Sequence, residues 1–220
     1  MKGAIIFDMD GALLDTERIY QKYWFRASQE LGYNLTEEDF LEFRSLGHSF
    51  AIEKMMEKTG KRESYDEIRD YRRKLMEPIM DVIEMPLKPG VNEALSLLKK
   101  SRFRLAVATA TRLDRTEKYL RRAGLLDFFD RLISARMVET GKPAPDVYLY
   151  ACKVLGEDPK NCFAVEDAPN GVKAAVAAGC RTIMVPDITE PDEEISCLIE
   201  YRADNLEDAA RYILKNAKSK

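Results

Sequence analysis

Short runs of apolar residues alternate with segments of helical pattern over most of the chain. Helices are expected at about 91–100, at 113–123, after Pro145, from about 170 and at 205–215. The apolar runs, which predict buried strands, lie at residues 3–7, 104–108, 132–133, 162–165 and 182–185. Strands that are apolar on both faces and alternate with helices are typical of a parallel sheet with helices on both sides. The pattern therefore predicts an α/β fold.

The segment from residue 16 to residue 85 has helical periodicity and no convincing strand. Its first helix is expected to end near Gly32, because glycine is a common helix stop. The run Thr36-Glu37-Glu38-Asp39 has the form of a capping box and predicts the start of a second helix. A long, highly charged helix is expected at 64–83.

These patterns divide the chain into two parts. We expect residues 16–85 to form an all-helical insertion after the first strand, and residues 1–15 and 86–220 to form the α/β core. The joints between the two parts, at about 14–17 and 84–88, are candidate hinges.

Composition narrows the possible functions of this 220-residue chain. Its 35 basic and 38 acidic residues are interspersed, so no basic stripe suggests nucleic acid as a partner. No apolar run approaches the roughly 20 residues of a membrane span, and a strand pattern within three residues of Met1 argues against a signal peptide. Cysteines at 152, 162, 180 and 197 form no metal-binding spacing and predict free thiols. We therefore expect a cytoplasmic protein, monomeric by default, without nucleic-acid or membrane partners.

The stretch Ile5-Ile6-Phe7-Asp8-Met9-Asp10-Gly11 carries the strongest chemical signal. Two carboxylates leave the end of a buried strand, where open α/β sheets place their functional groups. Two acids this close do not both ionise without a cation or a shared proton nearby. The motif alone is equally compatible with an ordinary Asx-type turn. It predicts either a metal site or an acid and nucleophile pair.

Three further polar groups are expected at the same edge of the sheet: Thr109, Lys142 and the pair Glu166-Asp167. Each alone has an ordinary explanation, as a backbone-bonded threonine, a solvated lysine, or acids at a helix N-terminus. Together with the first motif they suit phosphoryl transfer, which relies on positioning and charge stabilisation. A hard cation fits Asp8 and Asp167, and the chain has no GxxxxGK[ST] phosphate loop to do this work instead.

The ordered set Asp8-Met9-Asp10-Gly11, Thr109, Lys142 and Glu166-Asp167 resembles the four motifs of the haloacid dehalogenase-like (HAD) hydrolases. The paired aspartates favour the phosphatase and phosphomutase branches of that family. The resemblance implies a Rossmann-like parallel sheet core with an inserted all-helical cap domain, similar to the β-phosphoglucomutase-like group. It also implies that the cap closes over the site and contacts the substrate.

The resemblance assigns a role to each motif residue. Asp8 is expected to be the nucleophile that forms an aspartyl phosphate, and Asp10 the acid that protonates the leaving oxygen and then the base that activates water. Phosphate is expected to bind at Thr109, Ala110 and Lys142. The expected Mg²⁺ ligands are Asp8, the Asp10 backbone carbonyl, Asp167 and Glu166.

Three departures from the β-phosphoglucomutase pattern favour a phosphatase. Tyr20 stands where those mutases carry histidine, Phe50 where they carry a phosphate-clamping arginine, and Leu113 where they carry asparagine. A mutase needs a second anion site, and phenylalanine cannot supply bidentate phosphate recognition. The cations that remain as alternatives for such a site are Lys54, Arg44 and Arg112.

His48, the only histidine, is expected in a cap loop that faces the cleft, either as a substrate contact or as a polar loop residue without a role. Lys54 is a second candidate substrate contact in the cap. The leading hypothesis is a Mg²⁺-dependent phosphatase for a small phosphorylated metabolite, most simply a sugar phosphate. The alternatives are a phosphohexomutase, a phospho-accepting binding or signalling module, and a non-catalytic scaffold.

Overall fold

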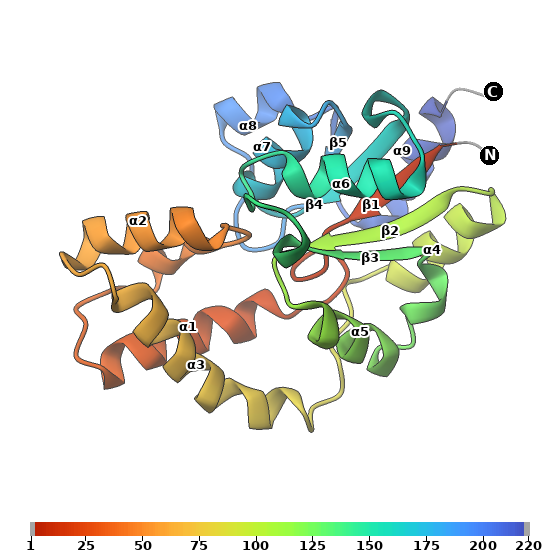
Figure 1. The fold of residues 1–220 in the computed structure, drawn as a ribbon. Coiled ribbons are helices and arrows are strands. Elements are labelled where there is room, and N and C mark those ends of the chain that lie inside the picture. Colours follow the sequence, from red (N-terminus) through yellow and green to blue (C-terminus); the bar gives the residue numbers. More distant parts are fainter. Residues whose placement is uncertain (1–2, 218–220) are drawn as a thin grey trace.

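The computed structural model describes residues 3–217 and contains one six-stranded sheet (Figure 1). All neighbouring strands are parallel, and their order is β3-β2-β1-β4-β5-β6. The strands are β1 (Ala4–Phe7), β2 (Arg104–Thr109), β3 (Arg131–Ser134), β4 (Cys162–Glu166), β5 (Arg181–Met184) and β6 (Tyr201–Arg202). The predicted α/β class with a Rossmann-like parallel sheet is confirmed.

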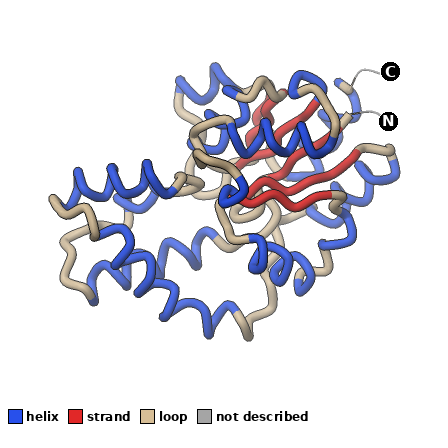
Figure 2. The backbone as a smooth tube through the Cα atoms, in the orientation of Figure 1, coloured by secondary structure: helices blue, strands red, loops and turns tan. Residues whose placement is uncertain are grey.

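Helices cover both faces of the sheet (Figures 1 and 2). One face packs against α4 (Val91–Lys100), α5 (Leu113–Arg122) and α9 (Leu206–Asn216), and the other against α6 (Asp146–Leu155) and α7 (Pro169–Ala177). Alternation along β1 separates the two cores, because Ile5 and Phe7 point to the first and Ala4 and Ile6 to the second. Small residues on the second face, such as Ala106, Ala108 and Ala164, let its helices approach closely.

The short elements that were not expected from the sequence include one α-helix and one strand. Helix α8 (Glu193–Leu198) begins where the Asp192 carboxylate accepts a hydrogen bond from the Ile195 amide at 2.8 Å. Strand β6 has two residues and continues the sheet beside β5. Neither segment is long enough to show a clear period. No helix within residues 3–217 is long and apolar enough to cross a membrane.

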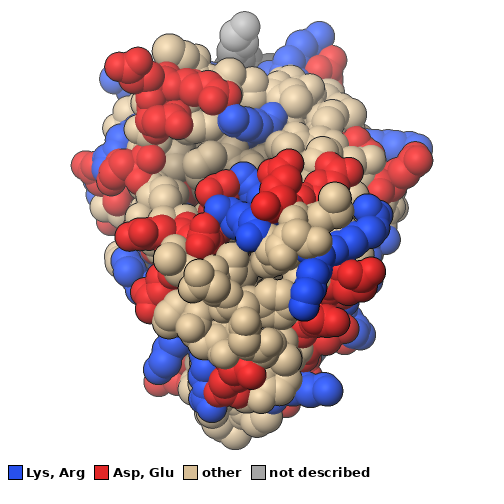
Figure 3. Space-filling model, turned by 90° about the vertical axis from the view of Figure 1, so that its left-hand side faces the viewer, with Lys and Arg blue, Asp and Glu red and all other residues tan. Residues whose placement is uncertain are grey.

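Residues 16–85 contain helices and no strand, and they lie to one side of the sheet (Figure 1). Their main helices are α1 (Glu17–Glu30), α2 (His48–Thr59) and α3 (Ser64–Met80). They share an apolar cluster in which Phe40 packs on Trp24 and Phe43 on Tyr65. On the outer face of this part, Lys and Arg side chains are interspersed with Asp and Glu (Figure 3). The exact domain boundaries at 15/16 and 85/86 stay a prediction.

The predicted capping box is present, but the helix that follows it is of a different type. The Asp39 amide donates to the Thr36 hydroxyl at 3.3 Å, and the Thr36 amide donates to the Asp39 carboxylate at 2.8 Å. The element that follows is a 3₁₀ helix, η1 (Glu38–Phe43), instead of the expected α-helix. The Thr36–Asp39 contacts thus close a turn without starting a full α-helix.

The two connections between the sheet and residues 16–85 run side by side. Leu14 and Leu87 form an antiparallel bridge, the Asp15 amide donates to the Pro86 carbonyl at 2.9 Å, and the Lys88 amide donates to the Leu13 carbonyl at 3.0 Å. These pairs fall within or next to the joints that the sequence indicates. Motion about them stays a prediction.

The helical part touches the core at a contact between two glycines. The Gly47 amide donates to the Lys142 carbonyl at 2.6 Å, and a Cβ added to Gly47 would lie 2.9 Å from the Gly141 Cα. Real Cβ atoms essentially never come this close to backbone, so the contact tolerates no side chain at Gly47. Gly47 has φ −65° and ψ 151°, which alanine adopts without strain.

We expect Gly47→Ala to hold the helical part away from the core without unfolding either part. Because the backbone angles suit alanine, the free energy of unfolding should change by no more than about 1 kcal/mol, the range for a cap substitution. Small-angle X-ray scattering should show a larger radius of gyration than in the parent. Ser49→Ala, two residues further on, is the control, and an unchanged radius in Gly47→Ala would show that the contact does not set the closed arrangement.

Candidate active site

The predicted motif residues meet at the carboxyl edge of the sheet. Asp8 follows β1, Thr109 ends β2, and Asp167 follows β4. Because β1 lies between β2 and β4, this is where the strand order changes direction, the usual place for a ligand in such a sheet. Asp8, Asp10 and Thr109 line a cleft of about 540 Å³ between the sheet and the helical part. That volume suits a small metabolite.

Lys142 is the central cation of the site. Its side chain is fully buried, and its ammonium donates to Asp8 Oδ1 at 2.5 Å, to Glu166 Oε1 at 2.7 Å and to the Ala108 carbonyl at 3.1 Å. Burial lowers the pKa of Lys142, but the Asp8 and Glu166 carboxylates more than offset this and raise it above its ordinary value. Lys142 therefore stays charged and holds the nucleophile candidate in a fixed orientation.

Asp10 is held by two hydroxyl groups that the sequence did not single out. Thr16 Oγ1 donates to one of its carboxylate oxygens and Thr111 Oγ1 to the other, each at 2.7 Å. Burial raises the pKa of Asp10 to about 6, with a contribution from the Asp8 charge, while the two hydroxyls oppose the rise. Asp10 thus keeps its proton to a higher pH than an ordinary aspartate.

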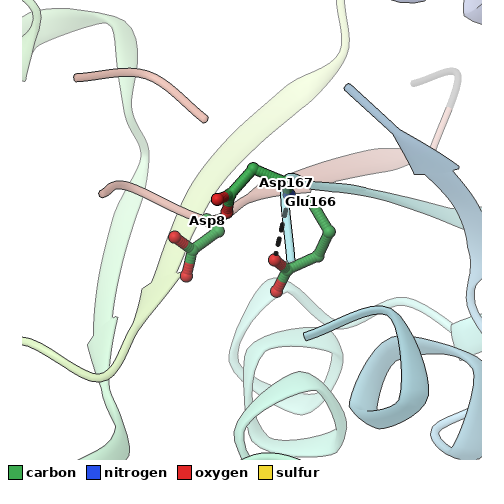
Figure 4. A group of neighbouring side chains, drawn as sticks. All are labelled: Asp8, Glu166 and Asp167. Atoms are coloured by element: carbon green, nitrogen blue, oxygen red, sulfur yellow. Dashed lines mark hydrogen bonds between the residues drawn. The ribbon is translucent and has the colours of Figure 1, made fainter. Parts of the chain in front are cut away.

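The site has the donor set of a hard cation. Asp8, Glu166 and Asp167 each offer an oxygen, and these oxygens lie within 4.8 Å of one another (Figure 4). Asp167 Oδ1 is buried without a hydrogen-bond partner among the described residues, as expected of an atom that awaits a ligand. Oxygen ligands of this kind suit Mg²⁺. The residues therefore fit the predicted metal.

Glu166 is less free than the other two acids. Its Oε1 accepts hydrogen bonds from Lys142 and from the buried Tyr148 hydroxyl, and its Oε2 accepts from the Asp167 amide at 3.3 Å (Figure 4). Burial raises the pKa of Glu166, and Lys142 opposes that rise. These bonds give Glu166 a role in orienting Lys142, and its service as a metal ligand stays a prediction.

Two glycines make room for the acids. A Cβ on Gly11, which has φ +91°, would lie 2.3 Å from Asp167 Oδ2, and a Cβ on Gly171 would lie 2.1 Å from Glu166 Oε2. Any side chain at either position would displace a carboxylate. The glycine that follows the first motif is therefore explained by space for Asp167 as well as by its backbone angle.

Arg44 enters the acid cluster from the helical part. The sequence offered it as a second anion site, but its guanidinium, only 4% exposed, donates to Asp167 and to Thr189 Oγ1. It also lies 3.8 Å from Asp187 Oδ2 and 3.6 Å from Glu17 Oε2. Arg44 thus places a positive charge on a predicted metal ligand. Nothing in the sequence pattern links these distant residues, so sequence reasoning did not find the contact.

The remaining predicted residues separate into two groups. Thr109 and Ala110 line the cleft, and the Thr109 hydroxyl accepts a hydrogen bond from the Thr111 amide at 3.0 Å. His48 also lines the cleft, but as the first residue of α2 instead of a loop residue, with Nε2 bonded to Asp66 at 2.8 Å. Lys54 is not among the cleft-lining residues of the described chain, because its ammonium is bound to Glu42 on the helical part.

The family model of the haloacid dehalogenase-like hydrolases matches residues 5–185, a span that includes every predicted motif. The chain therefore belongs to this family, and it is an enzyme of the phosphoric monoester hydrolase class. The family resemblance of the four motifs is confirmed.

Several individual proteins are similar to this chain over most of its length. The chain is 34% identical over 182 residues to the phosphorylated carbohydrates phosphatase of Thermotoga maritima, over 82% of this chain and 83% of that protein. It is 34% identical over 189 residues to hexitol phosphatase B of Escherichia coli K12, over 83% of each. A crystallised variant of CbbY from Rhodobacter sphaeroides, in complex with xylulose-(1,5)bisphosphate, matches with a TM-score of 0.76 and 27% identity over 94% of this chain and 96% of that one.

We expect Arg44→Met to tighten Mg²⁺ binding. In the parent a cation that reaches Asp167 must displace the guanidinium, and breaking a buried ion pair is costly. Isothermal titration calorimetry should give a dissociation constant lower by about tenfold or more. Lys54→Met, which removes a cation bound to Glu42 outside the cleft, should leave the constant unchanged. Equal or weaker binding in Arg44→Met would show that Arg44 does not compete with the metal.

Proposed function

We propose that this enzyme is a Mg²⁺-dependent phosphatase that hydrolyses a small phosphomonoester, a sugar phosphate, through a phosphoryl group carried on Asp8. The observation that carries the proposal is the group of Asp8, Asp10 and Lys142: Asp8 and Asp10 line the cleft, the buried Lys142 ammonium is bound to Asp8, and burial raises the pKa of Asp10. Two relatives at 34% identity are named as phosphatases of phosphorylated carbohydrates and of hexitols, which supports this class of substrate. A cytoplasmic location and a monomer are part of the proposal.

Asp8 acts as the nucleophile, and the hydrogen bond from the Lys142 ammonium orients its carboxylate for attack. One oxygen attacks phosphorus, and the bond to the leaving oxygen breaks. Lys142 and the Thr109 hydroxyl stabilise the negative charge on the phosphoryl oxygens. Asp8, Asp167, Glu166 and the Asp10 backbone carbonyl would hold the metal, whose positive charge makes the approach of an anionic phosphate to these carboxylates favourable.

Asp10 handles the proton in both half-reactions. With a pKa of about 6 it carries a proton in a useful fraction of molecules near neutral pH and gives it to the leaving oxygen. The resulting carboxylate then accepts a proton from the water that attacks the phosphoryl group on Asp8. Release of phosphate returns Asp8 and Asp10 to their starting states.

The cleft supports a phosphatase over a phosphohexomutase. Phe50 and Leu113, which stand where the mutases carry a phosphate-binding arginine and an asparagine, are not among the residues that line the cleft in the described chain. Tyr20, which replaces the mutase histidine, does line it. Phenylalanine and leucine have no group that can bind a phosphate.

We expect Mg²⁺-dependent phosphate release from a panel of sugar phosphates, and its loss in Asp8→Asn, because an amide cannot act as the nucleophile. The fall should reach at least about a thousandfold, the scale seen when a covalent nucleophile is removed. Phosphate release with and without EDTA, and isomerisation of glucose 1-phosphate, are followed in parallel.

Asp187→Asn, which alters a buried carboxylate 3.8 Å from the Arg44 guanidinium, is the control for loss of an acid near the site. Unfolding midpoints show whether each variant is folded. Phosphate release that persists in folded Asp8→Asn contradicts the proposed mechanism. Isomerisation without net phosphate release would make the enzyme a mutase.

The hydrogen bond from Thr16 sets the pH range in which Asp10 can act as an acid. Thr16→Val removes a bond that lowers the pKa of Asp10, so this pKa should rise by about one unit. The protonated form then persists to higher pH, and the limb where kcat/KM falls as pH increases should move upward by the same amount. The measurement is a pH–rate profile of the parent, Thr16→Val and Thr16→Ser, and Thr16→Ser should restore the parent profile. A limb that does not move in Thr16→Val would show that Asp10 does not produce it.

A further inference from the structure

Seven arginines line the cleft, and most of them are neutralised by a nearby acid. Five have a carboxylate within 4 Å: Arg44, Arg69, Arg73, Arg112 and Arg115. Arg72 and Arg136 have no such ion pair among residues 3–217. Among the described residues, the cleft therefore has two arginines without a carboxylate within 4 Å, one from the helical part and one from the core.

Arg72, on α3, is held in place by aromatic rings instead of by an acid. Its guanidinium carbon lies 4.4 Å from the ring centre of Trp24 and 5.0 Å from that of Tyr20, both on α1. Stacking of this kind fixes the guanidinium plane without using its hydrogen-bond donors. Its Nε is buried and makes no hydrogen bond within the described chain. A guanidinium that is stacked on aromatic rings and has no ion pair is suited to a bidentate anion such as a carboxylate or a phosphate.

Arg72 faces the same space as the reaction centre without belonging to it. Its charge acts on Asp10, yet both Asp10 carboxylate oxygens are already bonded to the hydroxyls of Thr16 and Thr111. Arg136 lines the cleft from the core, in the short helix η3 (Ala135–Met137) that follows β3. A substrate with its phosphate at Asp8 therefore has room to extend toward Arg72.

The other cations that the sequence suggested for a second anion are already occupied. Lys54 is bound to Glu42, Arg44 to Asp167, and Arg112 to Asp114 through two bonds of 3.0 Å. A second anionic group in the cleft thus has one well-ordered receptor in the helical part, Arg72. The names of the relatives include substrates with and without a second anionic group. A hexitol phosphate has none, and xylulose-(1,5)bisphosphate carries a second phosphate.

We propose that Arg72, with Arg136 across the cleft, binds an anionic group at the far end of the substrate. The substrate is then a phosphomonoester that carries a second anion, a carboxylate or another phosphate, in preference to a neutral polyol phosphate. This inference rests on the proposed phosphatase function and specifies its substrate class. In the proposed mechanism the transferred phosphoryl group lies at Asp8 and Lys142, so Arg72 contributes to binding and not to the chemical step.

The test compares three six-carbon substrates that differ at the end remote from the shared phosphate. Sorbitol 6-phosphate is neutral there, 6-phosphogluconate carries a carboxylate, and fructose 1,6-bisphosphate carries a phosphate. We expect the parent to have a lower KM for at least one of the two doubly anionic compounds than for sorbitol 6-phosphate, and the better of the two identifies the second anion. In Arg72→Met, KM for that compound should rise by about tenfold to hundredfold, with kcat unchanged. KM for sorbitol 6-phosphate should change less than twofold.

Arg73→Met is the matched control, because Arg73 is the next residue on α3, also lines the cleft, and is bound to Asp70. It should leave the preference intact, and Arg72→Lys should restore part of it. Equal loss in Arg72→Met and Arg73→Met would assign the effect to the general charge of the cleft and overturn the inference. So would a parent that hydrolyses sorbitol 6-phosphate at least as efficiently as both anionic compounds, a result that leaves the phosphatase function standing.

Binding separates the inference from the proposed function. If the parent releases phosphate from none of the three compounds, calorimetry on Asp8→Asn measures their affinities directly. Tighter binding of a doubly anionic compound than of sorbitol 6-phosphate, lost in Asp8→Asn/Arg72→Met, supports the second anion site even though the activity has failed. Equal or undetectable binding of all three overturns it.

Discussion

The site depends on one buried ammonium group. Lys142 lies between Asp8 and Glu166, which come from neighbouring strands, and it reaches them from the loop between β3 and α6. Two ionised carboxylates this close would repel each other strongly in the low dielectric of the interior. With Lys142 in place, the same pair becomes a compensated network in which Tyr148 donates a further hydrogen bond to Glu166. Lys142 therefore holds the Asp8 carboxylate in one orientation.

A second cation extends this compensation to the helical part. Arg44 brings its charge to Asp167 and Asp187, while Lys88, in the connection back to the sheet, bonds to Asp187 at 2.8 Å. Arg44 of the helical part and Lys88 of the connection thus both interact with the same group of buried acids. Arg44 directly follows η1, so a shift of the helical part relative to the sheet would also move this positive charge relative to the acids.

The fold and the motif positions could be predicted from the sequence because both rest on local pattern. The apolar runs mark buried strands, and the polar residues that follow them must lie at one edge of a parallel sheet. Strand β6 was missed because two residues carry no period. Thr16, Thr111 and Arg44 were missed as partners of the acids because their contacts join distant or ordinary-looking residues through the tertiary fold. The phosphate loop of other enzymes can be found from a contiguous sequence motif, whereas these contacts have no such motif.

Tyr20 bears both on the choice between phosphatase and mutase and on the position of Arg72 in the cleft. At this position, where the related mutases carry histidine, the tyrosine ring lies under Arg72 and, together with Trp24, forms the surface on which the guanidinium rests. Histidine has a smaller and more polar ring and would give weaker stacking and a second cation close to the first when protonated. The tyrosine at this position therefore also supports an arginine that has no ion pair. Catalytic groups from the sheet define the reaction, and a stacked arginine from the helical part defines what can occupy the other end of the cleft.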